Sequence, residues 1–419
     1  MSQLTKLLIY GLLALVIAST AQVMGAQTKT GCNGMSSKDW RILIEDIKTK
    51  NPESLKKLAA DPALLKKQTE SMRQLLAFAC QAKKEGLADE TSNATELENI
   101  RMETSAMTYD QTKNKLPNAP AFSLITDADV EAFYKNKAND EKFRRFLESK
   151  VEQLDRASTV RPNVTPDEEQ QAREYYAKIS IYDAAGRRLA AKLGPSYADR
   201  VTLQVKLQQA QFLARVYSDK IAQNMIATDD EISKFVASHP ELDTSKKKIA
   251  AQAILDRALA GENFAELANK YSEDPGNKND NGEPQGGLYS NVRKGTMVKP
   301  FEDAALALEP GKISPALVES DFGYHIIKLE KKAVSPDADG SPSVVYDVRH
   351  ILISTTVKDP ANPAARELPI SEYARGNIEN EKERAEVARI VAANPIQIAE
   401  LRLTATSTAA KRPVRRRNR

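Results

Sequence analysis

Residues 264–329 read FAELANKYSEDPGNKNDNGEPQGGLYSNVRKGTMVKPFEDAALALEPGKISPALVESDFGYHIIKL. Two short amphipathic helices are predicted here, because apolar side chains recur at i, i+3, i+4 and i+7 from Phe264 and again from Phe301. The first pattern ends at Asp274-Pro-Gly and the second at Glu309-Pro-Gly, both of which are turn sequences. A polar, Gly-rich excursion separates the two helices, and a strand is predicted from Phe322 to Leu329.

Taken in order, the motifs of this stretch resemble those of the parvulin peptidyl-prolyl isomerases. They are FAELA from Phe264, YSEDPG from Tyr271, GGL from Gly286, GTMVKPFEDA from Gly295, LEPGKIS from Leu308 and FGYHIIK from Phe322. The resemblance implies an α+β fold, with a parvulin-like antiparallel sheet and surrounding helices joined to a mostly α-helical, chaperone-like lobe. A helical lobe around a parvulin insert is the arrangement of the exported SurA- and PrsA-like foldases.

The first strand departs from the family's pattern. Parvulins ordinarily begin with a strand that carries Arg-His-Ile-Leu, but the residues around His239-Pro240 cannot form it. Instead the segment 344–353, which contains Arg349-His350-Ile-Leu, follows the strand of His325. We therefore expect a circularly permuted domain. A second parvulin domain that starts at Tyr346 is the competing interpretation, but it lacks a second series of motifs.

A hairpin between these two strands tests the idea of permutation. The turn-rich segment 335–340, centred between Asp337 and Ala338, would place His325 opposite His350. On the same face it would pair Ile327 with Val348 and Leu329 with Tyr346. On the other face it would pair Lys328 with Asp347, so that opposite charges meet.

The resemblance also implies an active site and a function. It assigns His325 and His350 to the floor of a proline pocket formed by Leu288, Met297 and Phe301, and it places Asp274 beside the substrate carbonyl. Without the resemblance, Asp274 could be a helix stop and the other residues ordinary core. Isomerisation requires no nucleophile, and no cofactor or metal is expected, since no third ligand joins the histidines. The substrates would be unfolded, proline-containing exported polypeptides; a holdase without catalytic activity is the alternative.

The N-terminus indicates export. Lys6 precedes the apolar run 7–18 and small residues follow it, as in a Sec-type signal peptide within residues 1–26. A retained membrane anchor is the alternative, and in either case we expect the periplasm or cell envelope. In that oxidising compartment Cys32 and Cys80 could form a disulfide or remain free thiols.

The charge distribution argues against nucleic-acid binding by the chain outside its last nine residues. The net charge is +4, but Lys411 to Arg419 supply six positive charges, leaving about −2 for the rest. This tail is expected to be solvated, with contact to anionic lipid head groups or nucleic acid as the alternative.

The 419 residues suggest two or three domains. We expect helical regions at 27–120 and 121–235, the parvulin domain at 236–353, and a C-terminal helix with the basic tail at 354–419. Thr126, Thr165 and Thr228 each precede a charged helix as an N-cap.

Overall fold

The computed structural model describes residues 32, 34–114, 120–155, 164–336, 342–360, 364, 366–401 and 403. The expected signal peptide and basic tail lie outside these residues. The chain divides into two compact units, which we call the helical unit (residues 1–225 and 383–419) and the sheet unit (226–382). Together they confirm the α+β fold class.

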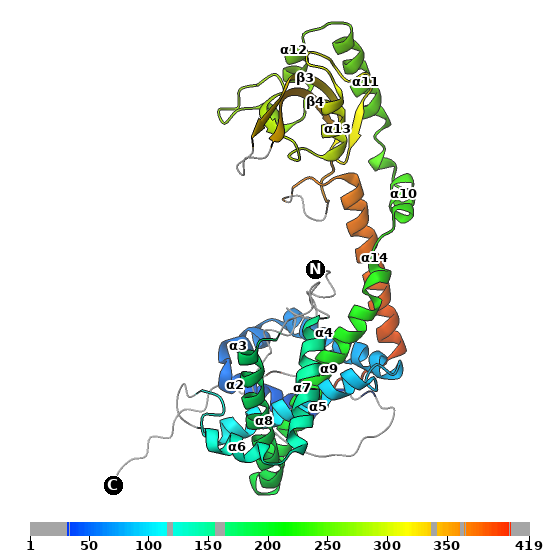
Figure 1. Cartoon of the computed structure of the whole chain (residues 1–419). Helices are drawn as coiled ribbons and strands as arrows, with labels where there is room; N and C mark the ends of the chain where they lie inside the picture. The colour runs from blue at the N-terminus through cyan, green and yellow to red at the C-terminus, as the bar shows by residue number, and fades with distance from the viewer. Residues whose placement is uncertain are drawn as a thin grey trace, which may run out of the picture. The chain divides into compact units, whose positions relative to one another are not determined.

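The helical unit is built from eight helices in the described part of its N-terminal segment, together with the end of α14 (Figure 1). Proline begins several of them, and Ser36 and Thr165 form capping boxes that satisfy free N–H groups at the helix start. Their bounds are α2 Ser37–Lys50, α3 Pro52–Ala60, α4 Pro62–Lys84, α5 Thr91–Lys113, α6 Asp127–Tyr134, α7 Ala138–Asp155, α8 Pro166–Leu193 and α9 Pro195–Met225.

Two apolar clusters hold the helical unit together. One contains Trp40, Met72 and Leu75 with side chains of α9 and with Ile390 of α14 (Ile370–Ala393). The other joins aromatic rings of α7 and α8 to Met102 of α5. The helical periodicity predicted for this region is thus confirmed, and the end of α14 belongs to the core of the N-terminal helices. In the described part of the chain no helix is long and apolar enough to cross a membrane.

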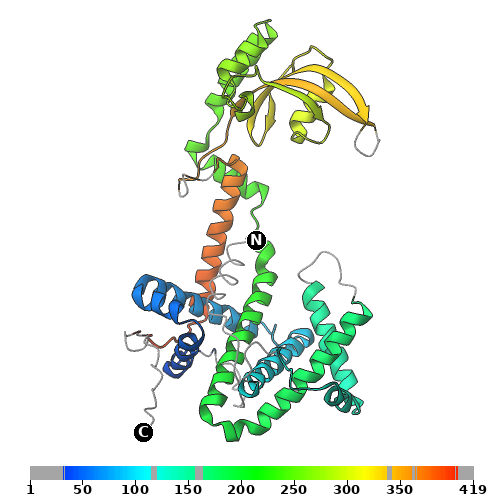
Figure 2. The same cartoon turned by 90° about the vertical axis from the view of Figure 1, so that its left-hand side faces the viewer.

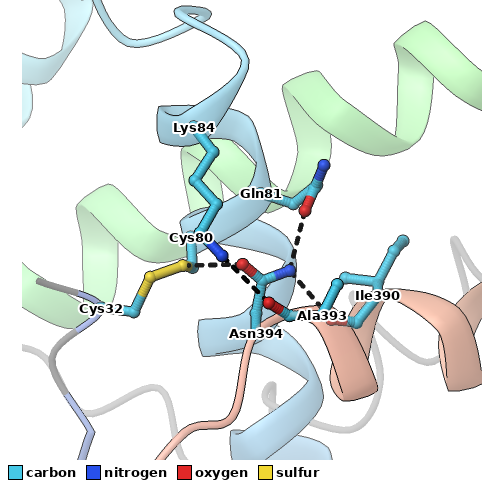
Figure 3. Close-up of a disulfide and its surroundings, with 7 residues drawn as sticks. All are labelled: Cys32, Cys80, Gln81, Lys84, Ile390, Ala393 and Asn394. Atoms are coloured by element: carbon cyan, nitrogen blue, oxygen red, sulfur yellow. Dashed lines mark hydrogen bonds between the residues drawn. A yellow bond between two sulfur atoms is a disulfide. The ribbon is translucent and has the colours of Figure 1, made fainter. Parts of the chain in front are cut away.

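The disulfide left open by the sequence is present between Cys32 and Cys80 (Figure 3). It ties the segment before α2 to the buried face of α4. Asn394, just after α14, lies beside it, with Nδ2 donating to Gln81 Oε1 at 2.8 Å and to the carbonyl of Ile390 at 2.9 Å. The segment before α2 and the residue after α14 therefore meet at α4.

The sheet unit carries a four-stranded antiparallel sheet of order β1-β4-β3-β2. The long β3–β4 hairpin stands out in yellow to orange in Figure 2. The bounds in this unit are α10 Asp229–Ala237, η1 Pro240–Leu242, α11 Ser245–Leu259, α12 Phe264–Tyr271, η2 Pro275–Asn277, β1 Leu288–Arg293, α13 Lys299–Ala307, β2 Val318–Ser320, β3 Gly323–Pro336 and β4 Pro342–Ser354.

Strand alternation gives the sheet two apolar faces. Tyr324, Ile326, Ile351 and Ile353 pack with α11 and α12 in one cluster. Ile327, Leu329, Tyr346 and Val348 pack with α13 in another. We call these the α12 face and the α13 face. The histidines, at odd positions of β3 and even positions of β4, belong to the α13 face.

The predicted hairpin is present, but its predicted register was wrong. His325 lies opposite Leu352 and His350 opposite Ile327, while Leu329 pairs with Val348 and Lys328 with Arg349. From Gly323 to Leu329 the shift is two residues, so these side chains keep their predicted faces. The predicted centre of the turn, Asp337 and Ala338, lies outside the described residues; the ladder on either side pairs Pro336 with Pro342.

A bulge at Glu330 reduces this difference. Beside the turn the ladder lies three residues from the predicted register, and the extra residue brings the shift to two at the histidines. Glu330 is the extra residue between the pairs Leu329–Val348 and Lys331–Asp347. Its carboxylate accepts from Lys328 Nζ at 3.0 Å and from Arg349 Nε at 3.1 Å. It therefore bridges two like charges that the register places directly opposite each other.

Candidate active site

The two histidines of the α13 face meet side by side. His325 and His350 are diagonal neighbours on β3 and β4, and their rings stack with centroids 5.6 Å apart. Their Nδ1 atoms are 3.4 Å apart. Only 4% of His325 and 6% of His350 is exposed, so the pair is enclosed by protein.

Polar partners at both ends extend the pair into a chain. His325 Nε2 is 2.7 Å from Ser320 Oγ, at the end of β2. His350 Nε2 is 2.7 Å from Asp274 Oδ2, which also accepts the Tyr289 hydroxyl at 2.7 Å. The result is a continuous line from Ser320 through both imidazoles to Asp274 and Tyr289.

Asp274 anchors this line as a carboxylate. Burial raises its pKa, but the hydrogen bonds from His350 and Tyr289 outweigh burial and lower the pKa to about 2. Its other oxygen, Oδ1, accepts the Gly276 N–H at 3.0 Å and caps η2. The turn-forming and site roles weighed from the sequence are thus compatible, because each uses a different oxygen.

The ionised carboxylate fixes the protons along the line. A carboxylate only accepts, so His350 Nε2 must carry a proton that it donates to Asp274. The two Nδ1 atoms of His325 and His350 share one hydrogen bond at 3.4 Å, and His325 Nε2 is bonded to the Ser320 hydroxyl. Burial, and then the proximity of His350, lower the pKa of His325 to about 4, so His325 is neutral at pH 7.

An aromatic ring lies against the histidine pair. Phe301, on α13, is 2% exposed and meets His325 and His350 edge-on, with centroid distances of 5.3 and 5.1 Å. Half-buried Met297, just before α13, packs against the same apolar cluster as Phe301. Five of the six site residues expected from the sequence therefore lie around the α13 face: Asp274, Met297, Phe301, His325 and His350.

Leu288 is the exception. It pairs with Arg349 on β4, so strand alternation directs it to the α12 face and away from His350. Tyr289, one residue later, pairs with Val348 and lies on the α13 face, with its ring 5.3 Å from that of His350. The β1–β4 ladder is irregular between Tyr289 and Val292, where Asn291 has φ 55°.

Two glycines allow the backbone to lie close to Tyr289 and His350. A Cβ on Gly276 would lie 1.7 Å from the Tyr289 hydroxyl, and one on Gly287 would lie 2.2 Å from the His350 carbonyl. Gly287 has φ 69° and accepts the His350 N–H at 2.9 Å, holding the Gly-rich loop against β4. The glycines of this excursion therefore position the site's polar groups.

Sequence reasoning missed Tyr289 and Ser320. Tyr289 follows a motif residue directly, but its face depends on the strand pairing. Ser320 reaches His325 only because β2 turns back onto β3. Within the residues that the structure describes, no group of three His, Cys, Asp or Glu side chains could hold a metal ion.

Part of the chain is similar to known proteins. Residues 225–331 match the family model of the PPIC-type PPIase domain, a rotamase. The chain is 41% identical over 126 residues to foldase protein PrsA 4 of Bacillus cereus, which is 29% of this chain and 41% of that protein. It is 31% identical over 162 residues to chaperone SurA of Chromohalobacter salexigens, which is 38% of this chain and 35% of that protein.

A PrsA foldase of a Geobacillus species is 32% identical over 159 residues, 36% of this chain and 54% of the relative. The chain thus spans about a third to a half of the length of these relatives. The matches identify a parvulin-type isomerase domain similar to those of PrsA foldases and SurA chaperones. The family match ends at Lys331, before the strand that carries His350.

Proposed function

We propose that this protein is an exported foldase that catalyses cis–trans isomerisation of Xaa-Pro bonds in unfolded polypeptides. One observation carries the proposal: the buried line from Asp274 through His350 to His325 lies directly against Phe301. The parvulin-type domain match supports the same reaction. Export is inferred from the signal-peptide pattern of residues 1–26.

The proposed proline site comprises Met297 and Phe301. An apolar ring face and a flexible thioether suit a pyrrolidine ring, which has no N–H to satisfy. Tyr289, rather than Leu288, would border this site beside His350. The family match that ends at Lys331 and the central position of β4 support a circular permutation, in which the Arg349-His350 strand has moved behind β3.

The proposed mechanism uses environment rather than bond formation. Rotation about the prolyl bond faces a barrier of about 20 kcal/mol, because it breaks amide resonance. The planar amide carries more negative charge on its oxygen than the twisted one. An ionised Asp274 near that oxygen, in a site closed to water, would disfavour the planar forms and lower the barrier. His350 would orient Asp274 through its hydrogen bond, and the neutral His325 would add no charge to the site.

An isomerisation assay on an Xaa-Pro peptide tests the proposal, with Met297→Ala and Phe301→Ala compared to the parent chain. We expect each variant to lose at least tenfold in kcat/KM while remaining folded by circular dichroism. Equal rates in all three chains would reject the enzyme and leave a holdase that only grips extended chains. A holdase would then show a different effect: Met297→Ala and Phe301→Ala should suppress the aggregation of an unfolded protein less well than the parent chain does.

A further inference from the structure

Asn277 is a buried polar residue that the proposed mechanism does not use. It ends η2, three residues after Asp274, and only 4% of it is exposed. Its side chain bonds the backbone of two other segments: Nδ2 donates to the Ala268 carbonyl at 3.0 Å, and Oδ1 accepts the Gly287 N–H. These partners fix the orientation of the amide, because only its nitrogen can donate and only its oxygen can accept.

The backbone of Asn277 is bonded as well. Its N–H donates to the Asp274 carbonyl at 3.0 Å and closes the turn that follows Asp274. Its carbonyl accepts the Gln285 N–H at 2.8 Å. Asn277 therefore connects three segments through four hydrogen bonds: the last turns of α12, the turn of Asp274 and the loop before β1.

The loop before β1 is the segment that binds the backbone of His350. Gly287 donates its N–H to Asn277 Oδ1, and its carbonyl accepts the His350 N–H at 2.9 Å. The two backbones are in close contact, since a Cβ on Gly287 would lie 2.2 Å from the His350 carbonyl oxygen. A displacement of Gly287 would therefore also displace the backbone of His350.

Asn277 is thus bonded towards both residues of the hydrogen bond that joins His350 to Asp274. One connection runs from its N–H to the Asp274 carbonyl, and the other runs from its side chain through Gly287 to the His350 N–H. The Nε2–Oδ2 distance of 2.7 Å depends on where both backbones lie. A buried amide with both polar atoms bonded holds such a distance more closely than a loop that is free to move.

We propose that Asn277 is a positioning residue for isomerisation, which sets the distance between His350 and Asp274 by holding the Gly287 loop against the turn of Asp274. The inference rests on the proposed isomerase function. Asn277 acts through its neighbours rather than on the substrate. Its loss should therefore lower the rate of the reaction more than the affinity for the peptide.

Asn277→Ala tests the proposal in the full chain, because it removes both side-chain hydrogen bonds. We expect kcat for an Xaa-Pro peptide to fall about tenfold, with KM within about twofold of the parent. The matched control, Asn279→Ala, removes an amide from the same excursion that bonds Asn281 and Glu283, and should keep the parent's values. Ile254→Val, which weakens the core of the α12 face, controls for loss of stability and should also keep them.

A second measurement reports the position of the site directly. The chain has three histidines, so with isotope labelling of histidine alone the ring signals can be assigned by NMR from His325→Gln and His350→Gln. The proton that His350 Nε2 donates to Asp274 should give a downfield signal in the parent. In Asn277→Ala this signal should move upfield and exchange faster with water, and in both control variants it should stay unchanged.

The His350 signal decides the proposal. If circular dichroism shows that Asn277→Ala does not fold, Asn277→Ser takes its place, since a hydroxyl can keep one of the two bonds, and the same changes are expected at a smaller size. An unchanged His350 signal in the folded variant would overturn the proposal, whatever its rate. A parent chain without isomerase activity would reject the proposed function, whereas the His350 signal would still test the role of Asn277.

Discussion

His350 and Asp274 meet at 2.7 Å between Nε2 and Oδ2, although 76 residues separate them in the sequence. The contact exists because β4 lies at the centre of the sheet and the turn after α12 brings Asp274 beneath it. It joins β4, a strand beyond the family match, to a turn within that match.

The low pKa of His325 predicts how stability depends on pH. Burial lowers it from 6.5 to about 4, so the unfolded chain binds more protons than the folded one between these values. The stability from neutral His325 is complete above pH 6.5 and is lost as pH falls towards 4. Urea unfolding should show a loss of about 2 to 3 kcal/mol between pH 7 and 4 that His325→Gln reduces. His239→Gln, the control, should keep the parent's slope; equal slopes in all three chains would refute the prediction.

Tyr289 is predicted to be a positioning residue for Asp274. Tyr289→Phe keeps the ring beside His350 but removes the hydroxyl that donates to Asp274. We expect kcat/KM for an Xaa-Pro peptide to fall about fivefold, near 1 kcal/mol, with a small change in Tm. The pH profile should shift as well, because Asp274 loses one of the hydrogen bonds that lower its pKa.

Two further variants check this role. Gly276→Ala should reduce activity more than Tyr289→Phe, since the new Cβ would displace the Tyr289 hydroxyl. Tyr271→Phe, which removes a hydroxyl bonded to Arg257, is the matched control and should retain parent activity. An unchanged rate and pH profile in Tyr289→Phe would show that Asp274 needs no such support.

The bulge residue Glu330 is predicted to stabilise the hairpin electrostatically. Glu330→Gln leaves Lys328 and Arg349 opposite each other without a bridging carboxylate. We expect a loss of about 1 kcal/mol in urea unfolding at low salt, and a smaller loss in 0.5 M NaCl as screening weakens the repulsion. Glu309→Gln makes the same change at an exposed position and should have little effect. A loss that does not depend on salt would contradict the electrostatic explanation.

The disulfide is predicted to stabilise the helical unit. Cys32 and Cys80 are separated by 48 residues, so loop-closure entropy gives a stabilisation of up to about 4 kcal/mol. Dithiothreitol should therefore lower the urea midpoint of the parent. The double variant Cys32→Ser, Cys80→Ser should have a lower midpoint than the parent, and dithiothreitol should not change it. Peptide isomerisation should be equal in both, because the proline site belongs to the other unit. The same urea midpoint of the parent with and without dithiothreitol would contradict the prediction.

The sequence by itself determined the class of domain, the helices and most of the site. The spacing from Phe264 and from Phe301, and the caps at Thr126, Thr165 and Thr228, depend on contacts within a few residues, and the structure has the helices they predict. The two histidine strands needed only to form a hairpin to bring His325 and His350 to one face. From Gly323 to Leu329 the register error of two residues left each side chain on its predicted face, because side chains alternate with period two.

Only the tertiary structure decided the register, the bulge and the partners of Asp274. Glu330 is the extra residue of β3 and contacts Lys328 and Arg349, and Tyr289 rather than Leu288 lies beside the histidines because it pairs with Val348 on β4. Likewise, the disulfide joins Cys32 to Cys80 of α4, and Leu401 and Leu403 pack against the core of the helical unit. These features depend on residues brought together from distant positions, and local sequence patterns carry no information about such distances.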